Sequence, residues 1–171
     1  MVVDMRKSHY QPALDGLGVR TWDHYDPDAT HFVCFADGVA VASMRSAADR
    51  VGSGEASGDF PGLAAHLPRG TIGYLYLSRL LVVPAFRCLG LTAVIMYMAA
   101  AWWKSNSALD YVLASAKEPA AGARNLGAKV LAGPVRLGPD QVPILLVGVS
   151  LSALAGRAKS LLDRLGWLEE T

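Results

Sequence analysis

Two consecutive apolar stretches in the middle of the chain do most to limit its possible folds. Residues 71–83 (TIGYLYLSRLLVV) are rich in β-branched and aromatic side chains and end at Pro84, which cannot donate a hydrogen bond to a strand ladder. The next apolar run, residues 89–103, is 15 residues long. A membrane-spanning helix takes roughly 20. We therefore expect a buried strand followed by a buried helix, with no membrane span.

The rest of the chain predicts more elements of both kinds. Residues 30–45 contain two strand-like stretches joined by Asp37-Gly38, a dipeptide typical of tight hairpin turns. Residues 46–70 are rich in Gly, Ser, Ala and Asp without a sustained period, so we expect a long loop with a short helix near 60–66. The later expected elements are a helix over 90–104, a strand over 110–116, a short helix over 119–126, strands over 129–137 and 142–150, and a helix over 152–165 between an N-cap at Ser152 and a stop at Gly166. A hairpin followed by alternating strands and helices indicates an α/β (α+β) fold with parallel strands in the middle of its sheet.

Composition sets the broad class of protein. The 171 residues are 52% hydrophobic, enough for the core of a single domain over residues 1–171. The net charge of +1 does not fit a nucleic-acid binder. Residues 1–60 hold nine acidic and five basic side chains, whereas the remaining residues hold six and eleven. The second part of the chain is therefore the one expected to attract an anion.

The cysteines and the N-terminus bear on the cellular setting. Cys34 and Cys88 lie far apart, with no CxxC pattern and no histidine pair at metal spacing, so we expect neither a disulfide framework nor a metal. The first residues, MVVDMRKSHY, are charged where a signal peptide needs its apolar region. These features predict a cytoplasmic protein.

The segment between the central strand and the apolar helix has the character of an anion-binding turn. The first backbone N–H groups of a helix have no intrahelical partner, and together with the helix dipole they attract phosphate. Gly90 lets a ligand approach the backbone, and Arg87 adds a positive charge. The Walker pattern and the glycines of a dinucleotide-binding loop are both absent.

The pattern Arg87-x-x-Gly90-x-Thr92 resembles the R/Q-x-x-G-x-G/A signature of the GNAT superfamily of acyltransferases, and Leu126-Gly127-Ala128 resembles that family's L-G-F/A turn. The order of the expected elements agrees with the family. The resemblance implies a GNAT-like mixed central sheet with a parallel strand–helix–strand acyl-donor site, flanked by helices. It also implies that the thioester donor contacts Leu81, Val82, Val83, Arg87, Leu89, Gly90, Leu91 and Thr92.

A closer resemblance is to the acyl-homoserine-lactone (autoinducer) synthases and the N-acyl amino acid synthases. In order, those families show R-x-x-x-F/Y, E-x-D-x-F/Y-D, an arginine ending the hairpin, F-P in a long loop, and E-x-S-R on the central strand. The corresponding residues here are Arg6 and Tyr10; Asp23, Tyr25 and Asp26; Arg45; Phe60 and Pro61; and Ser78 and Arg79. The resemblance implies substrate-binding roles for Arg6, Tyr10, Asp23, Asp26, Arg45 and Arg79, and makes Tyr76 and Ser78 the candidate catalytic residues.

The chain departs from these families in two ways, and from the acetyl-CoA enzymes of the superfamily in one that counts against a generic acetyltransferase. Tyr76 and Thr21 replace the glutamates of E-x-S-R and of E-x-D. A tyrosine with a pKa of about 10 is a poor base at neutral pH, so water, a backbone carbonyl or another carboxylate must take the proton of the amine. Ala123 occupies the position where acetyl-CoA enzymes of the superfamily usually carry a tyrosine acid. Little chain precedes Arg6, so this is either a shortened member or an incomplete start.

Residue chemistry leaves two interpretations of the aspartates open. Asp23 and Asp26 lie in WDHYDPD, where aspartate either closes a turn or binds an ammonium group, with Arg45 fixing one of them. Strand alternation places Arg79 on the opposite face from Ser78. A buried arginine needs an acidic partner, so we expect a structural ion pair between Arg79 and one of the two aspartates.

Together these features predict an N-acyltransferase that moves an acyl group from an acyl-carrier-protein or CoA thioester to an amino-acid-like amine. The product would be an acyl-homoserine lactone or an N-acyl amino acid, with S-adenosylmethionine as one candidate amine. An acidic carrier protein would be steered by the basic residues of 61–171. The alternatives are a generic acetyl-CoA-dependent N-acetyltransferase and a non-catalytic acyl-binding or regulatory module. Acyl length and oligomeric state stay open.

Overall fold

The structure of the chain is a computed structural model. It describes the backbone of residues 1–16, 20, 22–118 and 120–167, and the side chains of these residues except 10 and 12–16. In chain order the elements are α1 (Val2–Gly16), β1 (Thr30–Ala36), β2 (Val39–Arg50), α2 (Gly54–Asp59), the 3₁₀ helix η1 (Leu63–His66), β3 (Gly73–Val82), the 3₁₀ helix η2 (Pro84–Phe86), α3 (Leu91–Asn106), β4 (Tyr111–Lys117), α4 (Ala121–Asn125), β5 (Lys129–Leu137), β6 (Val142–Ser150) and α5 (Leu151–Arg164).

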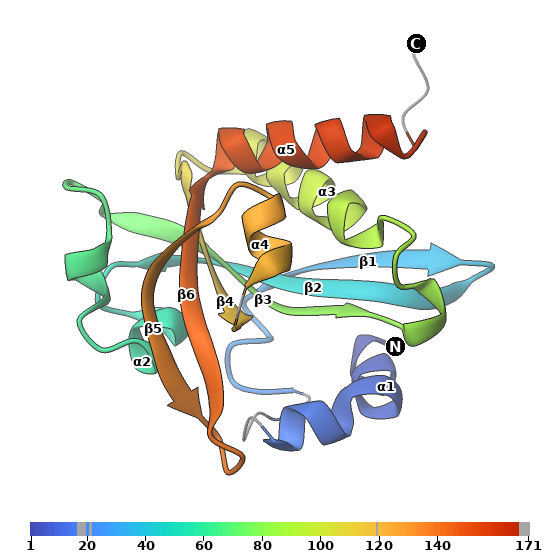
Figure 1. The fold of residues 1–171 in the computed structure, drawn as a ribbon, viewed down its shortest axis with the longest axis horizontal. Coiled ribbons are helices and arrows are strands. Elements are labelled where there is room, and N and C mark those ends of the chain that lie inside the picture. The colour runs from blue at the N-terminus through green and yellow to red at the C-terminus, as the bar shows by residue number, and fades with distance from the viewer. Residues whose placement is uncertain (17–19, 21, 119, 168–171) are drawn as a thin grey trace.

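The six strands form one mixed sheet in the order β1-β2-β3-β4-β6-β5 (Figure 1). Among the described residues only β3 and β4 pair in parallel, and they are the two middle strands, which confirms the expected mixed sheet. The β1–β2 hairpin turns at Asp37 and Gly38, whose φ angles of 49° and 78° are those of the predicted tight turn. The β3–α3–β4 order also follows the expected strand–helix–strand arrangement.

The helices cover the sheet on both faces. Figure 1 shows α3 and α5 side by side on one face and α1 and α2 on the other. Under α3 and α5, Leu75 and Leu77 of β3 pack with Ile95 in a largely apolar core. On the other face Tyr74 and Tyr76 pack with apolar residues of α2, η1, β4 and β6. None of the helices in the described part of the chain is long and apolar enough to cross a membrane.

The region predicted as a long loop over 46–70 is partly regular. Strand β2 continues to Arg50, because Ala47 to Arg50 pair with Gly73 to Tyr76 of β3. The helix expected near 60–66 is the shorter η1, and α2 precedes it. The β2–β3 pairing joins residues far apart in sequence, so the local composition of this region did not reveal it.

Two helix starts also differ from expectation. Helix α1 was not predicted at all. Helix α5 is capped by Ser150, whose hydroxyl accepts a hydrogen bond from the Ala153 N–H at 3.2 Å, and the expected cap Ser152 lies inside the helix. The predicted end is confirmed: Gly166, with φ of 69°, lies just beyond the last helical residue.

Candidate functional site

A β-bulge in β3 brings the site together. Ser43 of β2 faces Leu81, and Arg45 faces Ser78, so β3 has one residue more than β2 in this interval. Arg79 takes up the extra residue with a φ of 56°. Its side chain therefore lies on the side of the sheet that carries the Arg45 contacts. The expectation from strict alternation, that Arg79 faces away from Ser78, is wrong for this reason.

Arg45 is the centre of a buried polar network. Only 1% of its surface is exposed. Its Nε donates to the Ser78 hydroxyl at 3.0 Å, and its Nη1 donates to Asp23 Oδ1 at 2.7 Å and lies 3.2 Å from Asp26 Oδ2. Its Nη2 donates to Glu55. One guanidinium thus holds three carboxylates and a hydroxyl from three different parts of the chain.

Two further arginines complete the network. Arg6 of α1 donates from Nη1 to Asp26 Oδ1 at 2.9 Å, in a pair almost fully shielded from solvent. Arg79 pairs with Asp23, and its Nη2 lies 3.9 Å from Glu55 Oε1. The predicted ion pair of Arg79 is confirmed with Asp23 as its partner. Of the predicted substrate-binding residues, five therefore gather in one network.

The same aspartates also close the turn in which they lie. Asp26 Oδ2 accepts the backbone N–H of Asp23 at 2.8 Å, and Asp23 Oδ1 accepts that of Tyr25 at 2.9 Å. The Arg45 guanidinium lies over the Tyr25 ring, 5.9 Å from its centroid. The turn-closing interpretation is therefore confirmed, and binding of an ammonium group stays a prediction. Tyr10 lies in α1, but its side chain is outside the described residues, as is Thr21.

The network keeps its members charged. Burial opposes ionisation of Asp26, but the Arg6 hydrogen bond, the Asp23 N–H and the Arg45 charge hold its pKa below the usual range. Burial likewise opposes the charge of Arg45, yet the nearby carboxylates, led by Glu55, raise its pKa. For Arg79, burial and the neighbouring Arg45 lower the pKa. Each buried charge is thus compensated by opposite charges, as a low-dielectric site requires.

Helix α2 supplies a carboxylate that sequence reasoning missed. Glu55 joins Arg45 and Arg79 from a segment, GEASGD, that has the composition of a loop. The Asp49 carboxylate fixes the start of this helix: it accepts the Glu55 backbone N–H and lies where a side chain at Gly54 would be, 2.1 Å from a Cβ built there. The only sequence signal was an acidic residue in a first helical turn.

The two candidate catalytic residues, Tyr76 and Ser78, lie two positions apart on β3. Tyr76 is 2% exposed in the apolar cluster under α2, and burial, followed by the charge of Glu55, raises its pKa. A tyrosine in this environment stays neutral and cannot act as a base. Ser78 is 8% exposed, and its hydroxyl oxygen is held by the Arg45 Nε.

The expected donor loop follows on the same strand. Gly90 caps α3 with a φ of 81°, and its carbonyl accepts the N–H groups of Ala93 and Val94 at 2.8 and 3.1 Å. The N–H groups of Leu91 and Thr92 precede these and have no acceptor within the helix. The remaining predicted donor residues are placed as follows: Leu81 and Leu91 are buried, Val82, Val83 and Thr92 are half-buried, and Arg87 and Leu89 are exposed.

Beside this loop the two central strands separate. β3 and β4 pair only over Leu75 to Leu77, opposite Val112 to Ala114. After that point β3 stays paired with β2, and β4 stays paired with β6. A small pocket of about 50 Å³ lies at the separation, lined only by apolar residues that include Leu77, Ala114 and Ala123. Ala123, at the position where acetyl-CoA enzymes of the superfamily usually carry a tyrosine, thus lines an apolar pocket.

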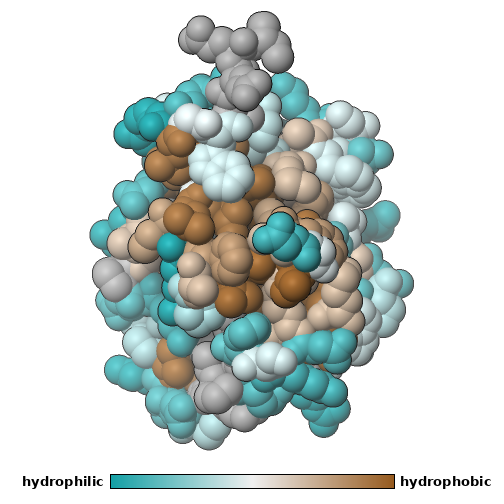
Figure 2. Space-filling model, turned by 90° about the vertical axis from the view of Figure 1, so that its right-hand side faces the viewer, coloured by the Kyte–Doolittle hydropathy of each residue, from teal (hydrophilic) through white to brown (hydrophobic). Residues whose placement is uncertain are grey.

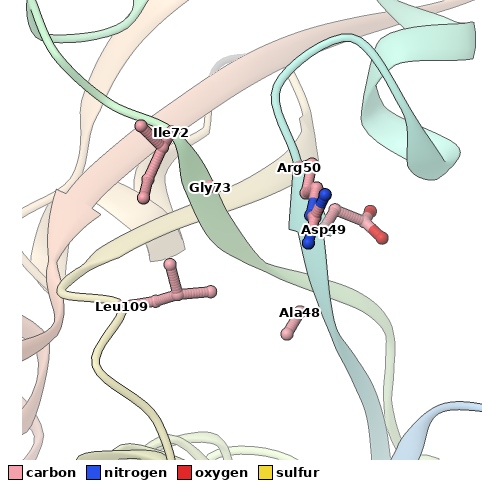
Figure 3. A pocket seen from close by; sticks show the side chains of 6 residues that line it. All are labelled: Ala48, Asp49, Arg50, Ile72, Gly73 and Leu109. Carbon is pink, nitrogen blue, oxygen red and sulfur yellow. The ribbon is translucent and has the colours of Figure 1, made fainter.

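A larger hollow lies at the other end of β3, away from this loop. It has a volume of about 430 Å³ and is lined by Ala48, Asp49, Arg50, Ile72, Gly73 and Leu109 (Figure 3). The Asp49 side chain points away from Ile72 and Leu109, and its carboxylate is engaged at the start of α2. This hollow therefore lacks the polar groups of the site, and we do not assign the chemistry to it.

The surface near the donor loop is unusually apolar. Figure 2 shows hydrophobic side chains gathered on the side of the molecule that carries the tip of the β1–β2 hairpin and the segment before α3. Exposed large apolar residues in these elements and in the end of α5 are Phe35, Val39, Leu89, Leu165 and Trp167. Patches of this kind often mark interaction surfaces.

Comparison with solved structures finds matches over nearly the whole chain. The CoA-dependent acyl-homoserine lactone synthase BjaI, in its structure with MTA, is 20% identical with a TM-score of 0.69, covering 98% of this chain and 82% of that chain. The N-acyl amino acid synthase FeeM from uncultured soil microbes is 13% identical with a TM-score of 0.69, covering 90% and 91%. NAA60 of Arabidopsis thaliana, with a bisubstrate analogue, is 12% identical with a TM-score of 0.61, covering 86% and 92%.

Comparison of the sequence with protein-family models and with curated proteins finds no match. At the identities above, the solved structures establish the architecture. An acetyltransferase of the GNAT family from Streptococcus pneumoniae also matches, at 12% identity with a TM-score of 0.52, covering 72% of this chain and 66% of that chain. The chain therefore has the GNAT acyltransferase fold, as its motifs implied, and shares it with acyl-homoserine lactone synthase and N-acyl amino acid synthase structures.

Proposed function

We propose that residues 1–171 form an N-acyltransferase domain that transfers an acyl group from a CoA or carrier-protein thioester to the amine of an amino-acid-like substrate. One observation carries the proposal. Strand β3 presents the buried polar network at Ser78 and Arg79, directly after its last residue paired with β4, and it ends at Val82, before the segment that leads into α3. A thioester on that part of β3 and an amine at the network would meet at the end of one strand.

The donor side has the features that a thioester needs. In the described part of the chain β3 and β4 do not pair beyond Leu77, so the amide groups of a pantetheine arm can approach β3 there. The free N–H groups at the start of α3 and the charge of Arg87 suit the phosphates. The apolar pocket at Ala114 and Ala123 suits the first carbons of the acyl chain.

The acceptor side is built for positioning. Ser78 and the carboxylates of Asp23 and Glu55 are held by arginine contacts, so little reorganisation accompanies binding. Developing charge on the thioester oxygen would be met by backbone N–H groups of β3 beyond Leu77. The enzyme then acts mainly by orientation and electrostatic stabilisation, without a metal.

The carrier and the amine are finer parts of the proposal. The apolar surface near Leu89 and the basic excess of residues 61–171 support docking of an acidic acyl carrier protein. The likeness to BjaI and FeeM structures supports S-adenosylmethionine or a free amino acid as the amine. A cytoplasmic location fits these substrates.

The test incubates the purified protein with acyl carrier proteins and acyl-CoAs of several chain lengths and a panel of amines that includes S-adenosylmethionine. Mass spectrometry should detect an amide product, and release of methylthioadenosine would identify the lactone route. An amide from an amino acid without methylthioadenosine would identify an N-acyl amino acid synthase. Absence of any amide across the whole panel would refute the proposal.

A substitution in the donor loop tests the binding of the thioester separately. Arg87→Ala should raise the KM for the thioester several-fold and leave the KM for the amine unchanged, because only the donor carries phosphate. Arg69→Ala is the matched control, since Arg69 is also exposed but lies before β3. Equal effects of the two variants on the donor KM would remove Arg87 from the site.

The rival is a non-catalytic acyl-binding module of the same fold. It is favoured by the neutral, buried Tyr76 and by Ala123, which together remove two groups that relatives would use for proton transfer. Stable binding of an acyl thioester, seen by calorimetry, without turnover of any amine would support this rival.

A further inference from the structure

A carboxylate on α2 lies close enough to Tyr76 for its charge to act on the phenol. The synthase families carry a glutamate at position 76, but Tyr76 is buried there under α2. Ala56 of α2 and Phe60, directly after its end, pack in the same apolar cluster as Tyr76. The helix is thereby fixed against the part of β3 where the amine would be deprotonated.

Helix α2 carries two carboxylates one turn apart, Glu55 and Asp59, which therefore lie on the same side of the helix. Their surroundings differ. Glu55 is engaged by Arg45 and Arg79. The Asp59 carboxylate has no hydrogen bond or ion pair within the described residues, although it is half-buried. Of the pair, only Asp59 has a carboxylate free to accept a proton.

We propose that Asp59 is the general base that accepts the proton of the attacking amine, taking over from α2 the role that the glutamate of E-x-S-R has in related synthases. The inference rests on the proposed acyl transfer and adds a catalytic residue to it. The groups around Asp59 are Glu55 on its own helix, Arg79 and Tyr76 on β3, Arg45 on β2 and Tyr25 before β1.

The electrostatic environment of Asp59 supports this role. Burial, followed by the charge of Glu55, raises its pKa to about 6, and the charges of Arg79 and Arg45 act in the opposite direction. A carboxylate with this pKa is mostly ionised at pH 7 and is a stronger base than an exposed aspartate. The negative charge of Asp59 also contributes to the raised pKa of the Tyr76 phenol.

The proton balance of the step is simple. The amine nitrogen forms a bond to the thioester carbonyl carbon, and the carbonyl π electrons move to oxygen. The nitrogen, now acidic, gives one proton to the Asp59 carboxylate. The oxyanion re-forms the carbonyl, the carbon–sulfur bond breaks, and the thiolate takes the proton that the Asp59 carboxylic acid holds. Thioester and amine thus become amide and thiol, with Asp59 returned to its ionised form.

The test compares Asp59→Asn, Asp59→Glu and the matched control Asp140→Asn, an exposed aspartate in the β5–β6 turn. The kcat/KM for the amine is measured from pH 5 to 8 with a saturating thioester, and thermal unfolding checks that each variant is folded. Asp59→Asn should lower kcat/KM by roughly 10²-fold and lose the acid limb near pH 6. Asp59→Glu should restore part of the rate with a shifted limb, and Asp140→Asn should match wild type.

The outcomes separate the two proposals. If wild type forms amide and folded Asp59→Asn keeps its rate and its acid limb, the assignment of Asp59 is wrong while acyl transfer stands. If wild type forms no amide with any donor and amine, acyl transfer itself fails and the assignment falls with it. Binding of the thioester should be equal in wild type and Asp59→Asn, which distinguishes loss of a base from loss of the donor site.

Discussion

On the α3–α5 face of the sheet the buried side chains are almost all apolar, whereas on the α1–α2 face three arginines and three carboxylates lie beside the second apolar cluster. The two faces share β3, whose Leu75 and Leu77 point to the first and whose Tyr76 and Ser78 point to the second. Strand β3 therefore contributes side chains both to the apolar core and to the polar network.

The contrast indicates the role of each face. Apolar burial stabilises the fold without directional demands, so its members contribute separately. Buried ion pairs pay for their desolvation only when all partners are present, and hydrophobic replacements would often stabilise the protein as well. A network of Arg45, Arg79 and their carboxylates is therefore better explained by a site than by stability.

The largest effect should come from breaking the network at its centre. Arg45→Ala leaves Asp23, Asp26 and Glu55 without their shared cation, and we expect the free energy of unfolding in urea to fall by about 3–5 kcal/mol. Arg50→Ala on the same strand is the control, because Arg50 is exposed, and it should change stability by less than about 0.5 kcal/mol. A loss below about 1 kcal/mol for Arg45→Ala would show that the network is loosely held.

On the apolar face a comparable truncation should cost less and leave the chemistry intact. Ile95→Ala removes a fully buried side chain of α3 and should lower the free energy of unfolding by about 2–4 kcal/mol. Met98→Ala on the same helix, 43% exposed, should cost well under half as much. Under conditions where Ile95→Ala is folded, its KM for the amine should equal that of wild type. A raised amine KM would couple the two faces.

The regular elements were predictable because their signals are local. The turn at Asp37-Gly38 fixes a hairpin by its own backbone preferences. The strand before Pro84 and the apolar helix after Gly90 are continuous in sequence. Most of the ordered motif set also predicted the residues that gather, since Arg6 and Asp26, 20 positions apart, meet as a buried pair.

What was missed depends on contacts between distant segments. The side of Arg79 depends on a bulge set by the register between β2 and β3. Helix α2, with two glycines in six residues, has little intrinsic helix preference and is held by Asp49 at its start and by Phe60 packing beyond its end. The composition of their segment predicts a loop, and a loop gives no basis for placing the Glu55 and Asp59 carboxylates at the site.

Acid titration tests the polar face without changing its sequence. The pKa of Asp26 is lower in the folded than in the unfolded chain, so its pairing contributes stability above about pH 4 that is lost as the pH falls further. Asp59 has the opposite sign: its pKa of about 6 means that stability rises as the pH falls from 6 towards 4. Urea midpoints across this range should therefore pass through a maximum near pH 4 to 5. In Asp59→Asn the rise between pH 6 and 4 should be smaller, because Asp49, whose pKa burial also raises, still contributes to it. An undiminished rise would contradict the assignment to Asp59.

At the boundary of the two faces, the donor turn depends on a single backbone conformation. Gly90→Ala forces an alanine to a φ of 81° and brings its Cβ to 2.6 Å from Leu165 Cδ1, at the flexible end of an exposed side chain. We expect a loss of about 1 kcal/mol, mostly from the backbone, and a raised donor KM. Gly122→Ala, with ordinary φ and open space, should be neutral or stabilising. If Leu165→Ala fully rescued Gly90→Ala, the contact rather than the backbone would set the cost.

The smallest effect concerns a polar group on the apolar face. Ser150 caps α5 by accepting the Ala153 N–H, whereas Ser152 lies in the first turn, where its hydroxyl contacts only that of Ser150. Ser150→Ala should cost about 1 kcal/mol in urea unfolding, and Ser152→Ala only a few tenths. Neither should change the KM for donor or amine, because a cap acts on one helix end and not on a shared network. The reverse order of the two costs would mean that α5 begins two residues later, as the sequence alone predicts, and would shift the contacts of α5 over α3.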